Sequence, residues 1–181
     1  HGSMSAYAQT KYNIFREQTP NDVKMLNWND TACRRAAKIG HGRVIWFGNK
    51  LPVKVGGVTV NGSWVMERKQ NKVVKLFPLG EWKLPGAHNL ENLLAATAVA
   101  RSMNVPATII VQSVKSFHGV PYRQQLIRTW RGHQFINDTA STSPDATLAA
   151  MAIYPRGVYI IGGTDKALQL GLWAREIARR N

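Results

Sequence analysis

The chain has 181 residues, with 24 Lys or Arg against 10 Asp or Glu, which gives a formal net charge of +14. This length suits one ordinary domain or two small ones and is enough to bury a core. Hydrophobic residues make up 44%, which excludes a disordered chain, and no apolar stretch approaches the roughly 18–20 residues of a membrane span. The single cysteine, Cys33, excludes an intrachain disulfide and a zinc site built from cysteines. We therefore expect a soluble cytoplasmic protein.

The excess of positive charge is also found in proteins that bind nucleic acids, because Lys and Arg neutralise phosphates and release counterions. Here, however, the basic residues are spread along the whole chain, and no run of five like charges occurs. Such a distribution is typical of a solvated basic surface. We therefore expect no nucleic-acid partner. The alternative interpretation is a basic nucleic-acid-binding module.

Residues 1–119 predict helices at both ends with short strands between them. The predicted elements are a helix over 3–15, a strand over 23–26, a helix from Asn29 or Asp30 to Lys38, strands over 53–55, 58–60, 63–66 and 73–76, and helices over 89–103 and 107–117. Asn61-Gly62 indicates a type I′ hairpin. The alternation from Arg43 to Lys83 predicts a small antiparallel β insertion in a larger α/β unit.

Gly119-Val-Pro121 interrupts this pattern, and we place a domain boundary there, between 1–119 and 120–181. The second part predicts strands over 125–130, 133–137 and 158–161 and helices over 144–151 and 168–179. This alternation favours an α/β unit with mainly parallel strands. Open parallel sheets usually contain more strands, so the chain is expected to be a fragment.

Polar side chains gather at the start of the Ala-rich helix predicted over 89–103. Asn89 and Asn92 are three residues apart and share a helix face. Their amides can donate and accept hydrogen bonds, which suits an adenine edge or a phosphate. The alternative is that Asn89 is an N-cap and Asn92 an ordinary polar residue.

Two further polar clusters follow predicted strands of the second part. In the first, Tyr122-Arg123 precedes a strand that ends in Asn-Asp138 and continues through hydroxyl residues to Pro144. Backbone amides and hydroxyls there could bind a carboxylate or phosphate, or simply cap the helix through Thr142 or Ser143. The second is Gly162-Gly-Thr-Asp-Lys166, a glycine turn beside a cation. The chain contains no G-x-x-x-x-G-K-[ST] phosphate loop.

Read in order, these motifs resemble the Mur ligases, the ATP-dependent enzymes that add amino acids to the peptidoglycan precursor. The opening stretch through Lys11 is similar to the segment that carries the family's carbamylated lysine. Residues 84–96 are similar to the family's G-x-H-N-x-x-N-x-x-A-A segment, and 117–123 resemble its crossing between domains. The resemblance implies an α/β fold, with the second half of the central ATP-binding domain over 1–119 and the first half of a Rossmann-like C-terminal domain over 120–181.

Within the family, residues 137–147 and 162–166 look like those of the members that add D-glutamate. The resemblance implies ATP and Mg2+ as cofactors, and UDP-N-acetylmuramoyl-L-alanine and D-glutamate as substrates joined through an acyl phosphate. It also implies that the N-terminal part of the enzyme is missing, so that this chain alone is inactive. Another Mur-type or a folylpolyglutamate-type ligase is the alternative.

The resemblance also implies a role for particular residues. These are Lys11 near magnesium if it is carbamylated, Asn89 and Asn92 at the adenine, Arg123 at the phosphates, Asp138 at the ribose, and Thr139, Thr142 and Lys166 at D-glutamate. An exposed helix lysine is the alternative for Lys11. Two positions depart from the family pattern, because Tyr122 stands where many members have His and Ala140 where some have Lys.

Overall fold

The computed structural model describes residues 3–69, 72–164 and 170–179. The chain divides into two compact units. Unit 1 contains the residues up to Lys83 together with Asn89–Phe117, and unit 2 contains Leu84–His88 together with the residues from His118 onward. The chain passes from unit 1 to unit 2 for the last time after Phe117, just before the Gly119-Val-Pro121 interruption.

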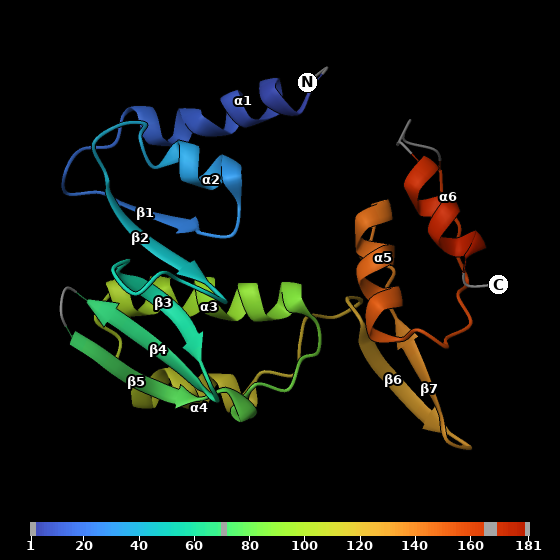
Figure 1. The fold of residues 1–181 in the computed structure, drawn as a ribbon. Coiled ribbons are helices and arrows are strands. Elements are labelled where there is room, and N and C mark those ends of the chain that lie inside the picture. The colour runs from blue at the N-terminus through green and yellow to red at the C-terminus, as the bar shows by residue number, and fades with distance from the viewer. Residues whose placement is uncertain (1–2, 70–71, 165–169, 180–181) are drawn as a thin grey trace. The chain divides into compact units, whose positions relative to one another are not determined.

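Unit 1 is built on one five-stranded sheet in the order β1-β2-β3-β4-β5 (Figure 1). The strands are β1 (Val23–Asn27), β2 (Arg43–Gly48), β3 (Gly57–Asn61), β4 (Trp64–Lys69) and β5 (Lys72–Pro78). β1, β2 and β3 are parallel, whereas β3, β4 and β5 form antiparallel pairs. The predicted antiparallel meander is present, and its first strand continues the parallel part of the sheet.

The strand prediction omits β2, and two of its details are wrong. Residues 53–55 form a turn, in which the Val55 N–H donates to the Pro52 carbonyl at 2.9 Å, and Val53 is 82% exposed, so burial does not favour a strand. The β3–β4 loop consists of Gly62 and Ser63, because Asn61 pairs with Trp64. Only Gly62 has a positive φ, of 58°, whereas a type I′ turn requires a positive φ at both central residues.

Four helices cover the sheet of unit 1, namely α1 (Met4–Arg16), α2 (Thr31–Ala36), α3 (Ala87–Ser102, from its third residue onward) and α4 (Ala107–Ser116). Helix α1 is capped by Ser3, whose side chain accepts from the Ala6 N–H, and α2 is capped by Asp30, whose side chain accepts from the Cys33 N–H. Helix α2 ends two residues before the predicted Lys38. Helix α3 begins before the predicted start, so Asn89 lies within its first turn and is not its N-cap.

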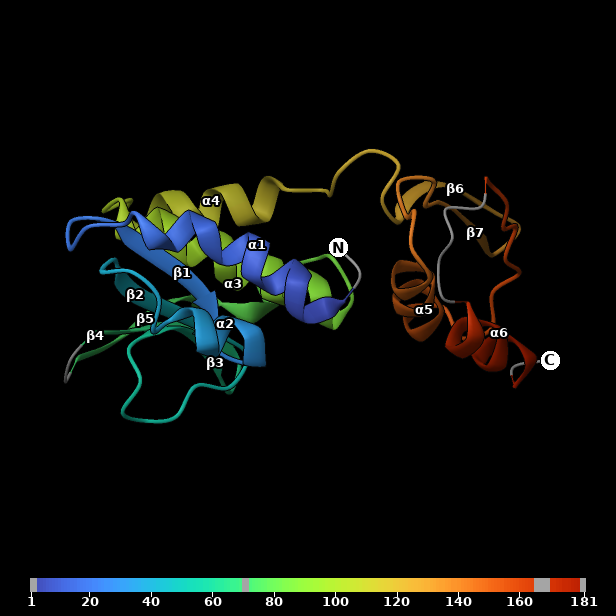
Figure 2. The ribbon, with the colours of Figure 1, turned by 90° about the horizontal axis from the view of Figure 1, so that it is seen from above.

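The alternation of side chains along the strands separates two cores. Leu26 of β1 packs with α1 and α2, which lie beside β1 in both views (Figures 1 and 2). Val58 of β3 and Phe77 of β5 pack with Leu94 of α3 and Ile110 of α4 in the larger core. The sheet therefore has one helix pair on each face.

Lys24 of β1 is a buried lysine, only 1% exposed. Its Nζ donates to the Ile39 carbonyl at 2.6 Å and lies 3.3 Å and 3.4 Å from the carbonyl oxygens of Ala37 and Gly40. These carbonyls follow the C-terminus of α2, where unsatisfied acceptors and the helix dipole favour a cation. Lys24 therefore fixes the α2–β2 connection.

We expect Lys24→Met to lower the free energy of unfolding by about 1–3 kcal/mol, because the apolar stem is kept while buried carbonyls lose their donor. Urea unfolding of the chain measures the change. Lys50→Met, at an exposed site, is the matched control and should change stability by less than about 0.5 kcal/mol. Equal effects of the two substitutions would contradict this role of Lys24.

Unit 2 contains a hairpin of β6 (Gln125–Trp130) and β7 (His133–Asn137), followed by α5 (Pro144–Ile153) and α6 (Gly171–Ala178). Both strands have the predicted bounds, but they are antiparallel. The expectation of mainly parallel strands is wrong for the described residues, because a connection as short as Arg131-Gly132 can join only antiparallel strands. Residues 158–161 are not a strand, and Val158 and Ile160 are almost fully exposed. Helix α6 lies within the predicted 168–179.

The helices in the described part of the chain are all too short or too polar to cross a membrane.

Candidate functional site

The predicted site residues of unit 1 lie on α1 and α3. Asn89 is half-buried in the first turn of α3, and Asn92 is exposed one turn later. Lys11 is exposed on α1, with its Nζ 5.4 Å from the centre of the Tyr7 ring, a cation–π distance. Among the described residues, no group of three or more His, Cys, Asp or Glu could hold a metal ion.

In unit 2, the predicted phosphate-binding residue Arg123 lies in a segment of unusual backbone conformation. We call residues 122–125 the Arg123 loop. Tyr122 and Gln124, which flank Arg123, have φ values of 64° and 45°. These values lie in the left-handed region, which residues other than glycine rarely adopt. The Tyr122 N–H donates to Oε1 of Gln125 at 3.0 Å, and the Arg123 N–H donates to the Val120 carbonyl at 3.2 Å. The loop is therefore tightly folded on itself.

The Arg123 loop is hydrogen-bonded to the segment that follows β7, residues 137–140, which we call the Asp138 turn. Oδ1 of Asp138 accepts from the Gln124 N–H at 2.9 Å, and the Ala140 N–H donates to the Tyr122 carbonyl at 2.9 Å. Within the turn, Oδ1 of Asn137 accepts from both the N–H and the hydroxyl of Thr139. The structure thus brings together three predicted site residues, Arg123, Asp138 and Thr139.

The guanidinium of Arg123 is exposed, and no described residue hydrogen-bonds or ion-pairs with it. A planar guanidinium presents five N–H donors in a fork that matches the oxygens of phosphate or carboxylate. The backbone of Arg123 is held while its side chain is open to solvent, which is the arrangement that an anion-binding arginine requires.

The helix after the Asp138 turn is capped by Ser143. The Ser143 hydroxyl oxygen accepts from the Ala146 N–H at 3.3 Å, and Pro144 occupies the first helical position. Thr142 is exposed and is not the cap, which resolves the alternative between the two residues. Lys166 lies outside the described residues. The strand predicted before it, over 158–161, is not formed.

Sequence reasoning missed Gln124 and Tyr154 as neighbours of Asp138. Tyr154 ends α5, and burial raises the pKa of its phenol, with a further increase from the negative charge of Asp138. Neither residue belongs to a recognisable motif, and both approach Asp138 only through the fold. No signal in the sequence could have found them.

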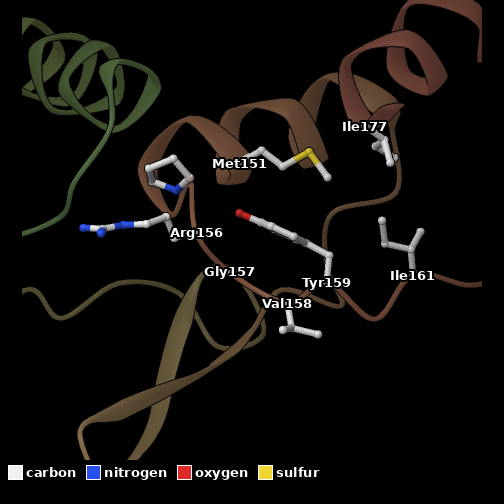
Figure 3. A pocket seen from close by; sticks show the side chains of 8 residues that line it. Met151, Arg156, Gly157, Val158, Tyr159, Ile161 and Ile177 are labelled. Atoms are coloured by element: carbon white, nitrogen blue, oxygen red, sulfur yellow. The ribbon is translucent and has the colours of Figure 1, made fainter. Parts of the chain in front are cut away.

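Unit 2 also contains a cavity of about 550 Å3 below α5 (Figure 3). Most of the described residues that line it have apolar side chains, among them Met151, Ile161 and Ile177, and Tyr159 and Arg156 add polar groups. The Tyr159 hydroxyl donates to the Tyr154 carbonyl at 2.6 Å. None of the predicted site residues that the structure describes lines this cavity.

Unit 1 is a mixed sheet with helices on both faces, and unit 2 has a solvent-exposed arginine and a capped helix. The chain is therefore an α/β protein of two units. Residues 1–100, more than half of the chain, match the model of the Mur ligase middle domain. The chain belongs to the Mur ligase family, as its motifs predicted.

Two similar curated proteins carry the name UDP-N-acetylmuramoylalanine--D-glutamate ligase. The one from Desulfitobacterium hafniense (strain Y51) is 33% identical over 99% of this chain and 40% of its own length. The one from Acidobacterium capsulatum is 35% identical over 92% of this chain and 36% of its own length. The chain therefore spans about 40% or less of the length of these relatives.

The fold is shared with solved structures. A crystal structure of MurF from Acinetobacter baumannii superimposes with a TM-score of 0.64 at 22% identity, covering 87% of this chain and 34% of MurF. The predicted α/β fold class is confirmed. The roles of the individual site residues stay predictions.

Proposed function

We propose that this chain is part of an ADP-forming ligase that joins D-glutamate to UDP-N-acetylmuramoyl-L-alanine. Family membership and the similar proteins of that name support the proposal. The observation that carries it is the hydrogen-bonded pairing of the Arg123 loop with the Asp138 turn. This pairing places an open arginine, suited to phosphate, next to the hydroxyl-rich segment proposed to bind the amino acid. A nucleotide-linked substrate and ATP also suit a cytoplasmic enzyme.

In the proposed reaction, the carboxylate of the muramoyl substrate attacks the γ-phosphorus of ATP, and the bond to the β-phosphate oxygen breaks to release ADP. The amine of D-glutamate then attacks the carbonyl carbon of the acyl phosphate, loses a proton and expels phosphate. Arg123 would stabilise the negative charge that moves through the phosphoryl group. Thr139, Thr142 and Lys166 would hold the carboxylates of D-glutamate.

The other proposed contacts concern ATP. Asn89 and Asn92 would hold its adenine from α3, and Asp138 its ribose. Mg2+, when bound, would offset the charge of the phosphates. Lys11 is exposed and so accessible to carbamylation, but the described residues by themselves do not make a magnesium site. The other ligands of the ion would come from the rest of a longer protein.

The proposal is tested in the full-length protein that contains this chain. We expect ADP release that requires both UDP-N-acetylmuramoyl-L-alanine and D-glutamate. A preference for L-alanine or glycine would overturn the D-glutamate assignment and leave another Mur-type ligase. Activity with folate-type acceptors would favour the folylpolyglutamate-type alternative. Without a phosphate loop, the 181-residue chain alone is expected to release no ADP.

We expect Lys166→Ala in the full-length protein to raise KM for D-glutamate about ten- to a hundredfold, because one charge-assisted hydrogen bond to a carboxylate is lost. KM for ATP should stay nearly unchanged. Steady-state kinetics with each substrate varied in turn measure both values, and Lys50→Ala is the control at an exposed lysine. Equal losses for ATP and D-glutamate would count against the assignment of Lys166.

A further inference from the structure

We infer that Asp138 is a positioning residue for Arg123: its carboxylate holds the Arg123 loop through the Gln124 N–H and so sets where the guanidinium points. The inference rests on the proposed function for what Arg123 binds. The positioning itself concerns only residues of unit 2. It adds to the ribose contact that the family resemblance implies for Asp138, since Oδ1 is the atom that accepts from Gln124.

The need for positioning comes from the backbone on each side of Arg123. Tyr122 and Gln124 have φ values of 64° and 45°. This conformation is unfavourable for residues other than glycine, because it brings Cβ too close to the following carbonyl oxygen. Two strained residues around one arginine persist only where the surrounding structure holds them. Without such restraint, the loop would relax and Arg123 would move with it.

The restraint comes from the Asp138 turn, which makes one hydrogen bond to each strained residue. The Ala140 N–H donates to the carbonyl of Tyr122 at 2.9 Å, and Oδ1 of Asp138 accepts from the N–H of Gln124 at 2.9 Å. A hydrogen bond to an ionised carboxylate is about twice as strong as one between neutral groups. The Asp138 carboxylate is therefore the charged side chain that holds the loop, in addition to the neutral Gln125 amide that accepts from the Tyr122 N–H.

The turn that carries Asp138 also carries Thr139, whose N–H and hydroxyl both donate to Oδ1 of Asn137. Hydrogen bonds therefore join the turn with Thr139 to the Arg123 loop. The Arg123 loop and the turn that carries Thr139 form one hydrogen-bonded structure. This gives a physical reason for the two segments to act together.

The positioning is tested first in the 181-residue chain without any ligand, by hydrogen exchange of the Gln124 amide measured by NMR. We expect Asp138→Ala to speed exchange of this amide about ten- to a hundredfold. Asp138→Asn retains an oxygen acceptor, so exchange should stay within a few-fold of the unchanged chain. Asp145→Ala, at an exposed carboxylate of α5, is the matched control. Unchanged exchange of the Gln124 amide in Asp138→Ala would overturn the inference.

Tyr154 reports whether the fold around position 138 survives. Removing the charge of Asp138 should lower the pKa of the Tyr154 phenol toward its ordinary value, while burial keeps part of the increase. Ultraviolet titration of the tyrosines in the unchanged chain and in Asp138→Asn measures this shift. The Tyr154→Phe chain identifies which part of the titration belongs to Tyr154. A tyrosine titration that does not respond to Asp138→Asn would contradict the placement of Asp138 beside Tyr154 and Gln124.

The second test uses kinetics of the full-length protein. Asp138→Ala should lower kcat, whereas Asp138→Asn should keep most of the kcat of the unchanged protein. In an Arg123→Ala background, Asp138→Ala should cause little further loss of kcat, because the group that it positions is already absent. If the double variant lost kcat by the product of the two single fold-losses, the inference would be overturned. If the unchanged full-length protein has no ligase activity, the proposed function fails, while the exchange result still decides the positioning.

Discussion

Glu67→Ala is expected to lower the free energy of unfolding by about 3–5 kcal/mol, because it removes one partner of a buried ion pair. Glu67 on β4 is 5% exposed. Its Oε2 accepts from both Nε and Nη2 of Arg101 on α3, each at 2.8 Å. Nη1 of Arg101 also donates to the carbonyl of Val105, at 2.9 Å. Glu67 therefore ties the sheet to α3 and to the start of the α3–α4 connection, and its loss leaves a largely buried guanidinium unpaired.

Equilibrium unfolding in urea measures this loss. Glu81→Ala is the matched control, because Glu81 pairs with Lys115 at 3.2 Å while the two side chains are 33% and 53% exposed. Exposed pairs contribute about 1 kcal/mol or less. A double-mutant cycle with Arg101→Ala should show strong coupling between Glu67 and Arg101. A loss for Glu67→Ala no greater than that for Glu81→Ala would contradict a stabilising role for the buried pair.

Arg123→Ala in the full-length protein is expected to lower kcat about 10²–10³-fold, the usual effect of removing one donor from developing negative charge. Arg123→Lys should retain part of the activity, since a point charge replaces the planar fork that matches phosphate oxygens. KM for D-glutamate should change much less than kcat. Steady-state kinetics with ATP, the muramoyl substrate and D-glutamate varied separately measure these effects.

Arg128→Ala is the control for charge alone, because Arg128 is an exposed arginine of β6 in the same unit. It should leave kcat nearly unchanged. Equal kinetics for Arg123→Ala and the unchanged protein would make Arg123 a surface residue and remove the main support for its role at the phosphates.

Local signals in the sequence determined most of the helices, the β6 and β7 strands, and the family. Ser3, Asp30 and Ser143 cap helices within three residues of their own positions, so their hydrogen bonds are readable from the sequence. Two strands separated only by Arg131-Gly132 could equally be recognised as a hairpin. The order of the motifs predicted the Mur ligase family, which the match of residues 1–100 confirms.

Only the tertiary structure decided which segments become strands and how polar groups pair over long distances. Residues 53–55 and 158–161 have suitable β-branched residues but are not paired as strands, because strand formation requires a neighbour that propensity cannot supply. Lys24 and Glu67 look like surface charges in the sequence, and they are buried because their partners lie on other elements. The same holds for Asp138 and Gln124, which lie fourteen residues apart along the chain. Such contacts depend on the whole packed fold, because their free energy is gained only when distant segments have already been brought together.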